Sequence, residues 1–138
     1  MQIIGHRGAR GEAPENTLGG FRYLHGLGIR AVEFDVRQLK DGQLVVIHDD
    51  DFVRTTGRAQ HVESCDLSEA QQFDHRHQWQ HWTFEEYTPS LPHVLECLTD
   101  FDHIEVEIKA VADEAAAERL IEQLHQDLKG FKTSATIT

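Results

Sequence analysis

The sequence predicts an α/β fold in which parallel strands are joined by helical crossovers. Short runs of apolar or alternating residues, typical of strands, alternate along the chain with segments whose apolar residues recur every three or four positions, as in amphipathic helices. Two interruptions stand out, a hairpin signal at Asp41-Gly42 and a polar segment at residues 50–88. With 138 residues, 39% of them hydrophobic, the chain is long enough for a single domain, residues 1–138, with a real core.

Apolar periodicity and end signals place four elements in the first part of the chain. Asn16 or Thr17 can cap a helix, and Gly28 is positioned to end it. Strict alternation over residues 31–37 predicts a strand with its charged residues on one face. The expected elements are a short buried strand at 2–5, a helix from Asn16 or Thr17 to about Leu27, and strands at 31–37 and 44–47.

The Asp41-Gly42 pair is typical of a two-residue hairpin turn. Such a turn would pair Lys40 with Gln43 across the two strands. In that register Asp35 lies directly opposite His48, on the same face of the sheet. The sequence thus predicts a specific neighbour for Asp35.

Residues 50–88 are polar and rich in His and Gln, and we interpret them as a small insertion. Inside it, Asp66 and Glu69 form a capping box for a short helix. Three of its histidines are expected on a solvated surface, because no Cys or carboxylate completes a metal-ligand set: His75, His77 and His81. Beyond the insertion we expect a helix from Ser90 to about Leu98, a strand at 104–109, a helix at 113–128 and the start of a strand at 135–138.

The composition argues against several classes of partner. A net charge of −11 disfavours a nucleic-acid backbone and an anionic membrane surface, since both attract clustered Lys and Arg. No apolar stretch has the length of a transmembrane helix, and no signal peptide is recognised, so the predicted location is cytoplasmic. Cys65 and Cys97 have no framework spacing and are expected to be reduced thiols.

Paired carboxylates on two predicted strands are candidate metal ligands. Glu33 and Asp35 share one face of their strand, and Glu105 and Glu107 repeat this arrangement. A solvated sheet face is the simpler interpretation for either strand alone. Strands between helical crossovers are usually covered on both faces, however, so that ionised carboxylates there need a cation or a functional role. Converging carboxylate oxygens suit Mg²⁺ or Ca²⁺.

Two histidines and two cations accompany these acids. His6 and His48 each follow an apolar run that suits a strand. A single histidine in such a place is more often structural, but together the two can act as a general acid and a general base. Arg7 is suited to bidentate contact with phosphate oxygens, and Lys109 to a second positive contact.

At these residues the chain resembles the glycerophosphodiester phosphodiesterase family. Any one of the matching motifs is weak, whereas their ordered set across residues 3–109 is specific. The motifs are His6-Arg7-Gly8, Pro14-Glu15-Asn16-Thr17, Glu33-x-Asp35, Lys40-Asp41-Gly42, His48-Asp49, Arg54-Thr55-Thr56, Pro89-Ser90-Leu91 and Glu107-Ile108-Lys109.

The resemblance implies a (β/α)₈ TIM-type barrel with a small insertion after the His48 strand. It implies hydrolysis of a small-molecule glycerophosphodiester to glycerol 3-phosphate and an alcohol, with attack by the glycerol's own neighbouring hydroxyl as the first step. The implied roles are one divalent cation, Mg²⁺ or Ca²⁺, held by Glu33, Asp35 and Glu107, general acid–base catalysis by His6 and His48, and phosphate binding by Arg7 and Lys109.

Two features depart from the family pattern. Glu105 stands where the family often has a neutral polar residue. A barrel of this type also takes about 250 residues, so this chain is expected to supply only its N-terminal half and to be poorly active alone. A truncated chain, a part of a longer protein, and a fragment completed by self-association or a partner chain are all compatible with the sequence.

Two other functions stay open at this point. One is a phospholipase D-like member of the same superfamily that releases a cyclic product, although such relatives are usually secreted and disulfide-bonded. The other is a non-catalytic phosphate-binding module, which we would expect to have lost His6 or His48. Both histidines are present.

Overall fold

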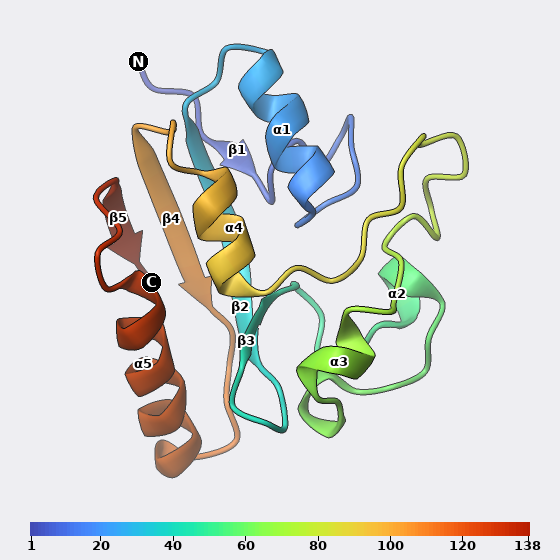
Figure 1. Ribbon diagram of the computed structural model, residues 1–138, viewed down its shortest axis with the longest axis vertical. Helices are drawn as coiled ribbons and strands as arrows, with labels where there is room; N and C mark the ends of the chain where they lie inside the picture. The colour runs from blue at the N-terminus through green and yellow to red at the C-terminus, as the bar shows by residue number, and fades with distance from the viewer.

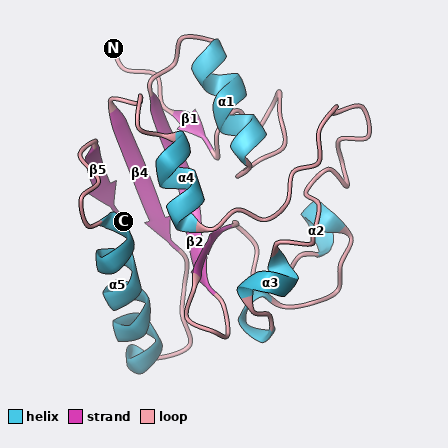
Figure 2. Ribbon diagram, in the orientation of Figure 1, coloured by secondary structure: helices cyan, strands magenta, loops and turns pink.

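The computed structural model describes all 138 residues and contains one five-stranded sheet with three helices packed on it (Figures 1 and 2). The strands are β1 (Gly5–His6), β2 (Ala31–Gln38), β3 (Leu44–Val46), β4 (His103–Ile108) and β5 (Ser134–Ile137). The helices are α1 (Leu18–Gly26), α2 (Val53–Thr56), α3 (Leu67–Ala70), α4 (Leu91–Cys97) and α5 (Glu114–Leu128), with a 3₁₀ turn η1 (Val62–Ser64).

The sheet is parallel and sequential apart from one hairpin strand. Strands β1, β2, β4 and β5 lie side by side in chain order and run parallel, while β3 pairs antiparallel with β2. Helices α1, α4 and α5 lie on the same side of this sheet (Figure 1). Sequential parallel strands with every crossover helix on one side form the wall of a (β/α)₈ barrel, whereas a doubly wound sheet carries helices on both faces.

The main core fills the space between the sheet and its helices. Alternate residues of β2 point into it, and Phe34 is fully buried with its ring edge-on to Phe21 of α1, 5.9 Å between centroids. The buried members of this cluster are Phe21, Leu24, Val32, Phe34, Val36, Leu44, Val46, Leu91, Val94, Leu95, Leu98, Phe101, Ile104, Val106, Leu120 and Leu124. Because these positions alternate along β2 and β4, the residues between them point to the opposite face, where the predicted acids lie.

Local signals in the sequence correctly located most helix ends. The Thr17 hydroxyl accepts a hydrogen bond from the Gly20 amide and caps α1, and Ser90 caps α4 in the same way. Asp66 and Glu69 form the expected capping box at α3. None of the helices is both long and apolar enough to cross a membrane.

The β2–β3 hairpin is one residue out of the predicted register. Asp35 lies opposite Ile47 rather than His48, and the Ile47 amide donates to the Asp35 carbonyl at 3.0 Å. His48 follows the last paired residue and leaves the ladder. The prediction that Asp35 and His48 face each other across the hairpin was therefore wrong.

The reason for the shift is the length of the turn. Leu39 and Gln43 are its closing pair, with the Leu39 amide donating to the Gln43 carbonyl at 2.9 Å, so that three residues rather than two form the loop. Gly42, with φ of 86°, occupies the left-handed position that ends a three-residue hairpin loop. The Asp-Gly pair correctly indicated a hairpin but not its loop length.

Two further predictions were wrong. The predicted buried strand at 2–5 is reduced to Gly5–His6, and Ile3 is 60% exposed, because β1 is an edge strand paired only with β2. His75, expected on a solvated surface, is buried, with its Nε2 2.7 Å from the Thr88 hydroxyl. The segment after it folds back so that the His75 amide donates to the Glu86 carbonyl, which encloses the ring.

The segment at residues 50–88 has a small core of its own. It packs on the face of the hairpin opposite the main core, and its cluster consists of Leu39, Val45, Ile47, Phe52, Val62, Cys65, Ala70 and Phe73. Helices α2 and α3 lie beside the sheet rather than over its helix-covered face (Figure 1). This segment therefore rests against the side of the sheet that carries the polar residues.

Candidate active site

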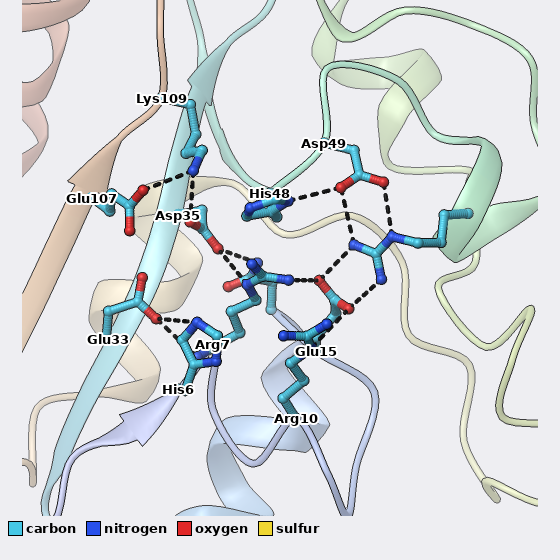
Figure 3. A network of polar contacts seen from close by, with 12 residues as sticks. His6, Arg7, Arg10, Glu15, Glu33, Asp35, His48, Asp49, Glu107 and Lys109 are labelled. Atoms are coloured by element: carbon cyan, nitrogen blue, oxygen red, sulfur yellow. Dashed lines mark hydrogen bonds and ion pairs between the residues drawn. The ribbon is translucent and has the colours of Figure 1, made fainter.

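Three carboxylates meet on the polar face of β2 and β4 (Figure 3). Glu33 and Asp35 share one face of β2, and the parallel register places Glu107 of β4 beside Asp35. Each of the three offers an oxygen, and these oxygens lie within 4.8 Å of one another. The structure thus brings together the three residues that the resemblance implied as metal ligands. Glu105 lies outside the group, with its carboxylate 3.8 Å from His103.

The chemistry of this cluster fits a hard divalent cation. Glu33 Oε1 is buried and has no hydrogen-bond partner, which is costly for a carboxylate oxygen unless a cation is bound. Burial raises the pKa of Glu33 to about 7, and the negative charges of Asp35 and Glu107 add to the effect although the Arg7 amide opposes it. All candidate ligands are oxygens, the donors that Mg²⁺ and Ca²⁺ prefer.

Arg7 lies in the middle of the acidic residues. Its backbone amide donates to Glu33 Oε2 at 3.0 Å, and its Nε lies 3.3 Å from Asp35 Oδ2. Its Nη1 donates to Glu15 at 3.3 Å. Arg7 has a φ of 50°, in the left-handed region that residues with a Cβ rarely adopt, so the local chain is held in this conformation by its surroundings.

Lys109 supplies the second cation of the site, directly after β4. Its Nζ donates to Glu107 at 2.7 Å and lies 3.8 Å from Asp35 Oδ1. The hydrogen bond from Lys109, together with its charge, lowers the pKa of Glu107, although burial opposes this change. The two predicted phosphate contacts therefore flank the acidic cluster on either side of Asp35 (Figure 3).

The two predicted catalytic histidines border the same cluster from different strands. His6 ends β1, and its Nε2 lies 3.8 Å from Glu33; partial burial and the charges of Arg7 and Arg10 lower its pKa. His48 follows β3, and its Nδ1 lies 2.8 Å from Asp49 Oδ1. Figure 3 shows the two rings on either side of Arg7.

Several polar residues of the site were not singled out from the sequence. Asn16, with a φ of 54°, donates from Nδ2 to Asp35 Oδ2 at 3.0 Å. Glu15, Asp49 and Arg54 form a further network beside Arg7 and His48. The available signal was their membership of the motifs that carry the family resemblance, but nothing in the sequence showed which residues they contact.

Comparison with known proteins places the chain in a family. A sequence profile of the glycerophosphoryl diester phosphodiesterase family matches residues 6–136. The chain belongs to this family. It is 37% identical over 109 residues to a glycerophosphodiester phosphodiesterase of Caldanaerobacter subterraneus subsp. tengcongensis, covering 78% of this chain and 45% of the relative. It is also 37% identical over 98 residues to one of Bacillus altitudinis, covering 71% of this chain and 40% of the relative.

Solved structures of the family share the fold of this chain. A phosphodiesterase of Oleispira antarctica, solved in complex with the product sn-glycerol-3-phosphate, superimposes with a TM-score of 0.89 at 30% identity, over 99% of this chain and 56% of that one. A glycerophosphodiester phosphodiesterase of Thermotoga maritima superimposes with a TM-score of 0.76 at 27% identity, over 99% of this chain and 53% of that one. The chain thus spans about half the length of its relatives, and its parallel sheet confirms the predicted TIM-type half barrel.

Proposed function

We propose that this chain carries the catalytic half of a phosphodiesterase that hydrolyses glycerophosphodiesters to glycerol 3-phosphate and an alcohol. The observation that supports the proposal most strongly is the meeting of Glu33, Asp35 and Glu107 within 4.8 Å on the polar face of a parallel sheet. Enzymes of this barrel type have their active sites at the carboxyl ends of the strands. His6 and Lys109 stand at or just after such ends.

In this proposal the acidic cluster holds one divalent cation, Mg²⁺ or Ca²⁺. When bound, the cation would acidify the attacking hydroxyl and neutralise charge that develops on phosphorus. Arg7 and Lys109 lie on either side of Asp35, where each is within reach of the carboxylates and of a phosphate placed over them. Their role is to orient the phosphate oxygens and to stabilise their charge.

The two imidazoles are suited to opposite proton transfers. The lowered pKa of His6 favours its neutral ring, which can accept the proton of the attacking hydroxyl. His48 has Nδ1 directed at the Asp49 carboxylate, so its protonated imidazolium form carries a second proton on Nε2 and can donate that proton to the leaving alcohol. After the alcohol leaves, the same pair can serve the attack of water that opens the cyclic phosphate.

The test is turnover of glycerophosphocholine by this chain with Ca²⁺ or Mg²⁺, followed as release of glycerol 3-phosphate. We expect slow release that EDTA abolishes and that falls at least a hundredfold in His6→Ala and in His48→Ala, since general acid–base catalysis contributes about 10²–10⁴-fold. His81→Ala, at an exposed position, is the matched control. Calcium binding measured by calorimetry should survive in both active-site variants.

Other outcomes would favour the alternative functions. Accumulation of a cyclic phosphate that is never opened would indicate the phospholipase D-like reaction. Binding of calcium and of glycerol 3-phosphate without any turnover, unchanged in His6→Ala, would indicate a phosphate-binding module. Absence of binding of both Ca²⁺ and Mg²⁺ at the acidic cluster would contradict the proposal as a whole.

A further inference from the structure

The side chain of Arg54 joins two carboxylates that come from different loops of the site. Its Nε and Nη2 donate to the two oxygens of Asp49 at 2.9 and 3.0 Å. Its Nη1 and Nη2 donate to the two oxygens of Glu15 at 2.6 and 3.0 Å. Both carboxylates are thus bound in the two-pronged geometry that only a guanidinium offers, and Nη2 is shared between them.

Each of these carboxylates also touches a proposed functional side chain. Asp49 Oδ1, which accepts from Arg54, lies 2.8 Å from Nδ1 of His48. Glu15 Oε2, which also accepts from Arg54, accepts from Nη1 of Arg7 at 3.3 Å. A continuous chain of polar contacts therefore runs from His48 to Arg7, and Arg54 is its central link. Figure 3 shows Asp49 joined to His48 at one end of this chain and Glu15 joined to Arg7 at the other.

The backbone of Arg54 is fixed by the small core of the inserted segment. Phe52 is fully buried there, with its ring edge-on to Phe73 at 4.9 Å, and it precedes the single turn of α2. The amide of Thr56 donates to the Phe52 carbonyl, and Gly57 ends the turn in the left-handed conformation with φ of 76°. The segment at residues 50–88 thus presents Arg54 to the site from a turn that is anchored in a packed core.

We propose that Arg54 is a positioning residue, which acts through Asp49 and Glu15 to hold the His48 ring and the Arg7 guanidinium in one fixed arrangement. An ionised carboxylate only accepts hydrogen bonds, so Asp49 held in this way accepts the Nδ1 proton of neutral His48 and leaves Nε2 as the free nitrogen. Without Arg54, Asp49 is free to rotate, and the ring loses the contact that selects its tautomer. This inference rests on the proposed function only for the roles of His48 and Arg7.

The deciding measurement is the tautomer of neutral His48, read at pH 8 from the ¹⁵N shifts of the chain labelled at histidine. His48→Gln identifies the resonances. We expect the Nδ1–H form to dominate in the wild type and Nε2–H to become the major form in Arg54→Met. Arg54→Lys keeps the charge but cannot donate hydrogen bonds to both oxygens of both carboxylates. Its ratio of the two His48 tautomers should therefore be intermediate between those of the wild type and Arg54→Met.

Matched variants separate positioning from general loss of structure. Arg76 lies in the same segment and binds Asp74 in a similar way, with Nη2 to Oδ2 at 2.7 Å, but it touches neither His48 nor Glu15. Arg76→Met should leave the His48 tautomer unchanged. If Arg54 acts through Asp49, then Asp49→Ala should shift the tautomer as Arg54→Met does, and the double variant should shift it no further.

An unchanged His48 tautomer in folded Arg54→Met, or an equal change in Arg76→Met, would overturn the inference. Should Arg54→Met fail to fold, Arg54→Lys carries the same test. The measurement needs neither metal nor turnover, so its failure differs from failure of the proposed function. Where turnover is measurable, Arg54→Met should lower kcat about 10–100-fold, the usual effect of removing a partner that orients a site residue, and Arg54→Lys should restore part of it.

Discussion

Glu33 makes the stability of the metal-free protein depend on pH in an unusual direction. Its pKa rises from the ordinary value of 4.5 to about 7 in the folded chain, mainly through burial and then through the charges of Asp35 and Glu107. The folded state therefore holds the proton more tightly than the unfolded state does. The stabilisation is fully present below pH 4.5 and is lost as the pH rises through 7.

The size of the effect follows from the shift. A change from 4.5 to about 7 corresponds to about 3 kcal/mol over the full titration, and to about 2.5 kcal/mol between pH 5 and pH 8. The Glu33 side chain is only 13% exposed, so solvent screening reduces this free-energy change only slightly. We expect the free energy of unfolding of the wild type to fall by this amount relative to Glu33→Gln, whose amide stays neutral at both pH values.

The assay is urea denaturation in EDTA at pH 5 and pH 8 for the wild type and Glu33→Gln. Comparing the two proteins cancels the contributions of other titrating groups. At pH 8, a divalent cation at a hundredfold excess over its Kd should raise the free energy of unfolding of the wild type by about 2.7 kcal/mol. The same cation should raise the free energy of unfolding of Glu33→Gln by less. A wild-type difference from Glu33→Gln that stays constant from pH 5 to pH 8 would refute this reasoning.

Two further predictions concern the scaffold that positions the site. Phe34→Ala empties a fully buried position of the main core and should lower the free energy of unfolding by about 3–5 kcal/mol in guanidinium denaturation; a loss under about 1 kcal/mol would mean that the core collapses around the gap. Gly5→Ala places a Cβ 2.5 Å from the Gly8 carbonyl oxygen. It should lower the melting temperature followed by circular dichroism, whereas Gly11→Ala, whose Cβ meets no atom within 4 Å, should melt like the wild type.

Features of the fold that depend on neighbouring residues were predictable from the sequence. The caps at Thr17 and Ser90 and the capping box at Asp66 each act within one helical turn, so their positions in the sequence fix where the helices begin. The alternation of β2 likewise settles that Glu33 and Asp35 share a face, since side chains alternate along any strand. The order of strands and helices then restricts the sheet to parallel crossovers.

Features that depend on loop length and long-range packing were not predictable. One additional residue in the hairpin loop makes Ile47, rather than His48, the cross-strand partner of Asp35, because a register shift of one residue changes every pair in the ladder. His75 is polar and its segment has no periodicity, yet the segment folds back and buries it against Thr88. No local pattern in the sequence encodes either result.

The sequence by itself determined which acids, histidines and cations belong to strand ends and motifs, because those properties are local or shared with the family. Only the tertiary structure decided how they are joined. Arg54 and Glu15 are 39 residues apart and meet through a separate small core. Contacts of that kind form only when distant segments pack together, since the folded backbone places the charges and the low dielectric makes their pairing strong.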